Sequence, residues 1–198
     1  YIVYCGFDEP HPDYGNINSL FIMDIQGNDH GRLAHNVCYA SISADKGSII
    51  YGRLDRETLL TDIVILNLES SEMKVVEESL GCSSASWAPE NDYIIAVCEN
   101  NLYAFSLDDS SKILIDDCEN RNGTCSSPNW SPHGKYIIYD FTKLFDTGSG
   151  VFAIDTECVY NQHECEPFKV GNTLNLGLFA WSPDSNYIAA PLNPGIIG

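Results

Sequence analysis

Basic residues are scarce in this sequence, and their scarcity excludes several classes of partner. Lys and Arg number 10 against 28 Asp and Glu, so the formal net charge at pH 7 is −18 over 198 residues. Such a chain lacks the positive surface that attracts nucleic acid or an anionic membrane. We therefore predict no nucleic-acid partner.

Long apolar runs are also lacking. No stretch approaches the roughly 18 apolar residues that a helix needs to cross a bilayer, so we expect no membrane insertion. The first residues do not show the basic-then-apolar pattern of a signal peptide. The sequence begins at Tyr1 rather than at Met, and we expect it to be a piece of a longer chain. Even so, 44% of its residues are hydrophobic, enough to build a core rather than an acidic disordered tail.

The sequence motifs of several kinds of active site are missing. There is no G-x-S-x-G; the nearest strings are Gly81–Ala85 and Gly148–Gly150, and neither fits a hydrolase nucleophile turn. There is no C-x-x-C zinc knuckle and no EF-hand spacing. We therefore predict no catalytic residue, no metal site and no cofactor. The acidic clusters 108–109 and 116–119 are interpreted as solvated surface, with weak Ca²⁺ binding as the alternative.

Cysteine, in contrast, is plentiful, with eight residues. Cys118 and Cys125 enclose six residues, as do Cys158 and Cys165. Both intervals are polar and rich in turn formers, and a tight turn can bring the two ends within disulfide range. We predict two disulfides here, with free thiols as the alternative, and hence an extracytoplasmic location (secreted, periplasmic or cell-surface).

The other four cysteines carry weaker expectations. Cys82 and Cys98 are cross-strand neighbours if Trp87 faces Tyr93 in a hairpin, which would allow a bridge. Cys5 and Cys38 are left as a pair between two repeats. A glycosylation sequon begins at Asn122, and it is relevant only in a eukaryotic secretory source.

The strongest pattern is a repeated segment that begins with tryptophan. Copies start at Trp87, Trp130 and Trp181, and each continues with Pro, a polar turn and a Tyr-Ile pair; a degenerate copy starts at Ile42. The copies recur at roughly 40–50 residues, a period typical of propeller blades or helical repeats. Helical spacing of apolar residues is not found. We interpret the three tryptophans as packing anchors rather than ligand platforms.

Each copy predicts four strands. The Tyr-Ile runs do not alternate polar with apolar residues, which indicates a strand covered on both faces. A third strand follows and ends in a polar turn residue, such as Asp24, Asn67 or Asp155, expected to bond its own turn backbone. A weaker, more polar fourth strand comes next, as an exposed edge requires. Four strands whose polarity rises outward describe a β-propeller blade.

The pattern Trp-Ser-Pro-Asp/His-Gly/Ser-Lys/Asn-Tyr-Ile resembles the repeat of TolB-type propellers, a WD-repeat-like group also seen in propeller domains of prolyl-oligopeptidase relatives. The resemblance covers nearly the whole chain and implies the fold. It does not decide the function, because the group includes scaffolds, surface binders and hydrolase lids. The sequence departs from the group in its eight cysteines and in Ala44, which replaces Pro in the first copy.

We therefore predict an all-β protein, a β-propeller of four-stranded antiparallel blades. Because Tyr1–Tyr4 matches a second strand and the last copy lacks its outer strands, we expect a partial propeller; a small ring of four to five blades is the alternative. The approximate repeats are 1–47, 48–92, 93–135 and 136–186, with a partial repeat at 187–198.

The predicted function is a non-catalytic binding or assembly module that presents loops to a protein or glycan partner. Loops on a rigid scaffold commonly carry recognition, and two long insertions follow second strands. The candidate binding residues in them are Asp8, Glu9, His11, Asp13, Tyr14, Phe145 and Asp146. The alternatives are the propeller domain of a prolyl-oligopeptidase-like serine peptidase, with its catalytic domain outside this chain, and a glycan-active enzyme with carboxylates in the channel.

Overall fold

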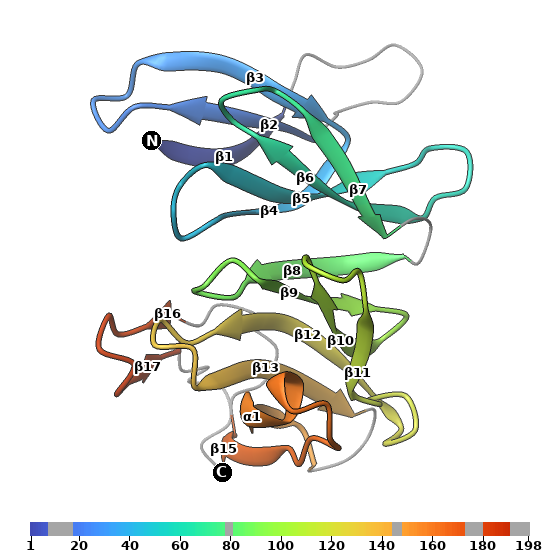
Figure 1. Ribbon diagram of the computed structural model, residues 1–198. Helices are drawn as coiled ribbons and strands as arrows, with labels where there is room; N and C mark the ends of the chain where they lie inside the picture. Colours follow the sequence, from blue (N-terminus) through green and yellow to red (C-terminus); the bar gives the residue numbers. More distant parts are fainter. Residues whose placement is uncertain (8–17, 78–80, 144–147, 173–179, 191–198) are drawn as a thin grey trace, which may run out of the picture. The chain divides into compact units, whose positions relative to one another are not determined.

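Antiparallel strands make up nearly all of the regular structure. A computed structural model describes residues 1–7, 18–77, 81–143, 148–172 and 180–190, and these contain a single four-residue helix. Within each sheet the strands pair in chain order (Figure 1). The predicted all-β class and the four-stranded antiparallel sheets are therefore confirmed. The chain divides into two compact units, Tyr1–Ala85 and Ser86–Gly198.

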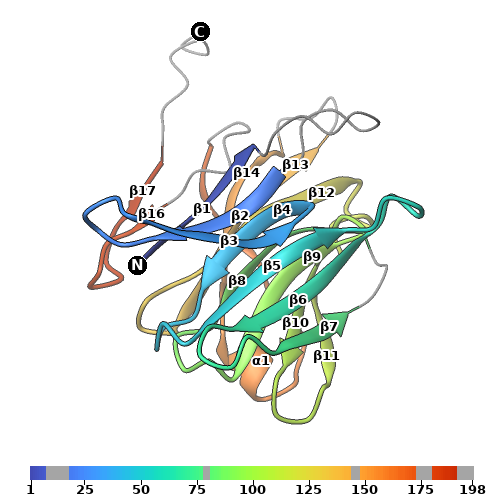
Figure 2. The same ribbon diagram turned by 90° about the horizontal axis from the view of Figure 1, so that it is seen from above.

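The first unit contains a three-stranded sheet, β1 to β3, and a four-stranded sheet, β4 to β7. In Figure 2 the strands β4 to β7 succeed one another in that order. Leu20, Ile49, Tyr51 and Val64 form the centre of its core. The strand bounds are β1 (Ile2–Phe7), β2 (Asn18–Met23), β3 (Asp29–His35), β4 (Val37–Ile42), β5 (Ser48–Leu54), β6 (Thr61–Asn67) and β7 (Met73–Glu77).

The later elements form two more four-stranded sheets, β8 to β11 and β12 to β15, and a two-stranded hairpin, β16 with β17. The short helix α1 was not expected. The bounds are β8 (Cys82–Trp87), β9 (Tyr93–Cys98), β10 (Asn101–Ser106), β11 (Lys112–Asp116), β12 (Gly123–Trp130), β13 (Tyr136–Lys143), β14 (Gly150–Asp155), α1 (Glu157–Tyr160), β15 (Phe168–Gly171), β16 (Ala180–Trp181) and β17 (Ile188–Ala189).

Burial follows the predicted polarity of the strands. The second strands β5, β9 and β13 are buried over most of their length, and the outer strands β7, β11 and β15 are largely exposed or half-buried. Trp87 and Trp130 are buried, which confirms their packing role, and the half-buried Trp181 packs against a smaller cluster of Ile138, Val151 and Ala153. Apolar runs without alternation were thus a reliable sign of strands covered on both faces.

Side-chain oxygens close the turns that join the strands. Oδ1 of Asp24 accepts hydrogen bonds from the backbone N–H groups of Gln26 and Asn28, each at 2.9 Å. Asn67 and Asp155 accept from their own turns in the same way. The role predicted for these residues is therefore confirmed, and it explains why Asp or Asn stands at the end of these third strands.

The serine of the Trp-Ser-Pro segment has a structural role that the sequence did not reveal. The hydroxyl of Ser131 accepts a hydrogen bond from the backbone N–H of Tyr136 at 2.9 Å, across the turn between β12 and β13. Ser43 and Ser182 make the corresponding bond in their own hairpins.

The four-stranded sheets begin one strand earlier than the predicted repeats. Each sheet starts with β4, β8 or β12, and these strands end at Ile42, Trp87 and Trp130, the first residues of the repeated segment. The predicted repeats start only at the following strand.

Candidate functional site

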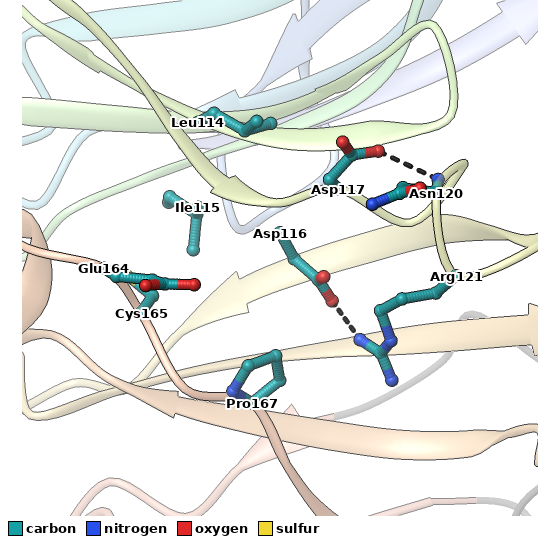
Figure 3. Close-up of a pocket in the computed structure, with 9 residues that line it drawn as sticks. All are labelled: Leu114, Ile115, Asp116, Asp117, Asn120, Arg121, Glu164, Cys165 and Pro167. Carbon is teal, nitrogen blue, oxygen red and sulfur yellow. Dashed lines mark hydrogen bonds and ion pairs between the residues drawn. The ribbon is translucent and has the colours of Figure 1, made fainter.

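A pocket of about 420 Å³ lies in the second unit, between the end of β11 and the segment that precedes β15. Figure 3 shows Asp116 and Arg121 facing each other, with Pro167 across from them and Glu164 next to Cys165. Leu114 and Ile115 of β11 complete the apolar part of the lining. The full lining is Leu114, Ile115, Asp116, Asp117, Asn120, Arg121, Glu164, Cys165 and Pro167.

Asp116 is the central charged group of this pocket. Its side chain is only 4% exposed, and it forms an ion pair with the guanidinium of Arg121. The hydroxyl of Tyr139, a fully buried residue of β13, donates a hydrogen bond to the same carboxylate oxygen. The interpretation of the cluster 116–119 as solvated surface is wrong for Asp116. The carboxylate can be buried because two donors satisfy it.

Arg121 is held by aromatic rings as well as by charge. The centre of its guanidinium lies 4.2 Å from the ring centroid of Phe141 and 4.7 Å from that of Phe152. Such cation–π contacts stabilise a guanidinium that is partly removed from water.

Tyr139, the other donor to Asp116, has a perturbed pKa. Burial, followed by the negative charge of Asp116, raises the pKa of Tyr139 above its ordinary value. Tyr139 therefore stays protonated and remains a donor.

The two predicted short-range disulfides are present in the structure. Cys118 and Cys125 are bonded with their Cα atoms 5.8 Å apart, and Cys158 and Cys165 with theirs 5.2 Å apart. The second bridge closes the loop that contains α1, and Cys165 itself lines the pocket. The two walls of the pocket are thus each tied to a disulfide loop.

The remaining cysteines are partly described. Cys82 and Cys98, on the neighbouring strands β8 and β9, are both disulfide-bonded. Cys5 lies exposed on β1, and the side chain of Cys38 falls outside the described residues. The pairing of Cys5 with Cys38 therefore stays a prediction.

One group of metal-ligating side chains stands out among the residues that the structure describes. The ligand atoms of Asp116, Cys118 and Cys125 lie within 4.8 Å of one another. The two sulfurs are bonded to each other, whereas a metal requires the thiolate form. In the oxidised protein this group is therefore a disulfide beside a buried ion pair.

The residues predicted to bind a partner lie outside the described part of the chain. They are Asp8, Glu9, His11, Asp13, Tyr14, Phe145 and Asp146. Asn122, the sequon residue, is exposed in the turn between β11 and β12 and has a φ of 58°. Its modification stays a prediction. In the described ranges no helix has the length and apolar character to span a bilayer.

No protein-family model and no curated protein matches this sequence. Solved structures do match in fold. TolB from Acinetobacter baumannii aligns with a TM-score of 0.70 and 13% identity over 90% of this chain. A putative TolB from Agrobacterium tumefaciens aligns with a TM-score of 0.70 and 17% identity over 94% of this chain and 69% of its own.

The β-propeller domain of the Trilobed protease from Pyrococcus furiosus also aligns, with a TM-score of 0.57 and 16% identity, over 84% of this chain and 53% of that one. The chain spans 44% of the length of the Acinetobacter TolB. Identities this low show the fold alone. With the sheets and the repeated segment described above, they establish that this chain has the fold of a TolB-type β-propeller.

Proposed function

We propose that this chain belongs to a non-catalytic propeller module that binds a protein partner through the pocket between β11 and residues 164–167. The observation that carries the proposal is a preformed pocket flanked by exposed apolar side chains. Leu114 is 48% exposed on one side, and Phe168, directly after Pro167, is 47% exposed on the other. Apolar groups exposed around a concave site are typical of interaction surfaces.

Rigidity of the pocket walls supports binding. The ion pair of Asp116 with Arg121 and the disulfide of Cys158 with Cys165 fix the two sides before any partner arrives. A site that is already ordered loses less conformational entropy on association than a flexible one. The pocket volume lies within the range of roughly 300–1,000 Å³ that small recognition sites occupy, enough for one or two side chains.

The charges around the pocket indicate the kind of partner. Asp116 is balanced by Arg121, but Asp117 and Glu164 add two further carboxylates to the lining. The chain as a whole carries −18, which attracts positively charged proteins over long distances. We infer that the partner inserts a segment that has a Lys or Arg next to an apolar side chain.

Site-directed photocrosslinking in the source organism tests this proposal. A photoreactive residue at Leu114 should yield an adduct with one protein, and Glu164→Lys should abolish that adduct by reversing the charge. The control is Leu59, a leucine of the first unit that is more exposed than Leu114 (73% against 48%), where no such adduct should form. The same adducts at both positions, or none at Leu114, would contradict the proposal.

A second candidate is the propeller domain of a serine peptidase, favoured by the likeness to the Trilobed protease propeller. In that case the nucleophile lies outside this chain, which has no G-x-S-x-G segment. Labelling of the full-length protein with a fluorophosphonate distinguishes the two candidates, because only a serine hydrolase forms the covalent adduct. An extracytoplasmic location is part of both proposals and is supported by the disulfides.

A further inference from the structure

The outer strand β15 begins directly after the pocket of the second unit. Pro167 lines that pocket, and Phe168 is the first residue of the strand. Among the described residues β15 pairs with β14 alone, so its other edge presents backbone N–H and C=O groups that face no strand there. An edge of this kind can accept a further strand from another chain.

The side chains of β15 give this edge little protection. Phe168 and Val170 are 47% and 45% exposed. Lys169 is the single charged residue of β15, whereas the outer strands β7 and β11 each carry two charged residues. Charges on an edge strand discourage the addition of another strand. By this measure β15 is the least protected of these three outer strands.

The backbone of β15 is regular at the end that adjoins the pocket. Its register against β14 shifts between Lys169 and Gly171, which is the end away from the pocket. Strands β7 and β11 have similar shifts, so this feature does not distinguish the three. Pro167 has no N–H group, so backbone pairing along β15 stops at Phe168, and an added chain leaves the strand where the pocket opens.

The charges of this segment give an added strand a direction. Glu164 and Glu166 precede β15 and are exposed, and Lys169 lies within it. Because the strands of this sheet are antiparallel, an added antiparallel strand reaches Lys169 first and the two glutamates afterwards. Opposite charges on paired positions stabilise such a pair of strands. The favoured order in the added strand is therefore an acidic residue followed by a basic one.

We propose that β15 pairs with an antiparallel strand of the protein partner, and that a Lys or Arg directly after this strand enters the pocket. This inference rests on the proposed function, because it assigns a conformation and a direction to the segment that the pocket binds. Strand β15 has only four residues, and pairing over so short a length is weak by itself. The strand and the pocket therefore bind the segment together.

Four synthetic peptides serve as probes. The first, acetyl-Thr-Val-Glu-Val-Leu-Lys-amide, follows the inferred order, and the second has the same residues in reverse order. The other two are the first peptide with N-methyl groups on alternate residues, one version for each edge of the extended chain. N-methylation removes the N–H groups that one edge needs for strand pairing and leaves the charge unchanged. Hydrogen exchange of the isotope-labelled chain, followed by nuclear magnetic resonance, reports which amides become protected.

We expect the first peptide, at saturation, to slow exchange by about tenfold or more at those amides of residues 168–171 that face away from β14. It should also shift the resonances of Leu114 and Glu164 in the pocket. One N-methylated peptide should bind like the first, whereas the other and the reversed peptide should bind about tenfold or more weakly. The amides of β7, where Met73 is 59% exposed, are the internal control and should not change.

A pair of variants tests the apolar contact. Val170→Lys should weaken binding of the first peptide by about tenfold, because it places a charge on the edge that the peptide covers. Met73→Lys makes the same kind of change on β7 and should leave binding unchanged. Thermal unfolding shows whether each variant is folded, and the exchange experiment on the unaltered protein tests the proposal even if Val170→Lys does not fold.

Four results would overturn the proposal. They are equal binding of the two N-methylated peptides, protection of β11 in place of β15, no protection of β15 at millimolar peptide, and β15 amides that are all protected before peptide is added. If the peptide shifts Leu114 and Glu164 but leaves β15 unprotected, this inference is wrong and the proposed function stands. If β15 becomes protected but no adduct forms at Leu114 in the source organism, the proposed partner site is wrong and the strand pairing stands.

Discussion

The hydroxyl of Tyr139 on β13 donates a hydrogen bond to the carboxylate of Asp116 at the end of β11, and so joins two neighbouring sheets of the second unit through buried polar groups. Arg121 binds the same oxygen. A buried carboxylate with two donors is stable, but one that loses a donor keeps its desolvation penalty without full compensation. The stability of this unit therefore depends on both donors.

Removal of the Tyr139 hydroxyl should lower stability measurably. We expect Tyr139→Phe to reduce the free energy of unfolding by ~1–3 kcal/mol and Arg121→Met to reduce it by ~3–5 kcal/mol, because the second change leaves a buried charge unpaired. Urea unfolding at neutral pH measures both. Tyr187→Phe is the control, since Tyr187 is 73% exposed. If Tyr139→Phe lowers the free energy of unfolding no more than this control does, the hydrogen bond from Tyr139 to Asp116 contributes nothing to stability.

The tryptophans that begin three of the four copies of the repeated segment should stabilise the protein through packing. Trp130 is 4% exposed, and its indole Nε1 donates to the backbone carbonyl of Gly134 at 2.9 Å. We expect Trp130→Ala to destabilise the protein by ~3–5 kcal/mol through the cavity it leaves. Tyr187→Ala, at an exposed position, should change stability by less than about 1 kcal/mol. Denaturant unfolding of the two variants decides whether the repeat marks a core position.

Trp130 and Asp116 show which structural roles the sequence could predict and which it could not. Trp130 recurs in register with Trp87 and Trp181, so its packing role could be inferred from the repeat. Asp116 has no such signal, because an Asp-Asp pair before a turn is the usual composition of a solvated loop. Its donor Tyr139 lies 23 residues away on another sheet, and only the packing of the two sheets brings them together.

The same distinction applies to the pocket and to the first unit. Cys165 closes a disulfide loop that could be predicted and Pro167 follows that loop, but their position opposite Leu114 depends on how this segment folds back against β11. In the first unit, Arg53 forms an ion pair with Asp62 because β5 and β6 are in register at those residues. A prediction of which strands pair, and in which register, could have found this ion pair. It could not have found the hydrogen bond between Arg56 and Asn36, because that bond depends on the conformations of two turns.

Tyr160 provides a test at alkaline pH. Burial, together with the negative charges of Asp92 and Glu90, raises its pKa to about 12 from an ordinary value of 10.0. A raised pKa in the folded state means that the stabilising contribution is present below pH 10 and is lost as the pH rises toward 12. Tyr160→Phe should therefore lose less stability over that window. Ultraviolet titration of tyrosinate should show one fewer residue ionising near pH 12 in the variant.

The disulfides can be tested chemically. Non-reducing peptide mapping should find Cys118 linked to Cys125 and Cys158 linked to Cys165. Replacing both Cys158 and Cys165 by Ser should lower the free energy of unfolding by about 2 kcal/mol, the value expected for a loop of this length. Four unmodified thiols in the mapped protein would remove the argument for an oxidising compartment.

We predict that the carboxylates of two hairpin turns, Asp184 and Asp45, respond to acid in the same way. In the turn between β16 and β17, the hydroxyl of Ser182 donates to Asp184 at 2.6 Å, and Asn186 donates through its backbone and side chain at 3.1 and 3.0 Å. These bonds, that of Ser182 first, lower the pKa of Asp184 to about 2. Ser43 and Asp45 repeat the arrangement, with the same 2.6 Å bond and a lowered pKa.

A lowered pKa in the folded state means that the turn is stabilised above the ordinary carboxyl pKa of 3.8 and loses this contribution as the pH falls toward 2. Ser182→Ala should move the pKa of Asp184 back toward 3.8, and Ser43→Ala should do the same for Asp45 alone. Carboxyl carbon resonances followed by nuclear magnetic resonance measure both values in one titration. Because the two turns belong to different repeats, each variant is the control for the other. A shift at both sites from one substitution would contradict the view that each turn is closed by its own serine.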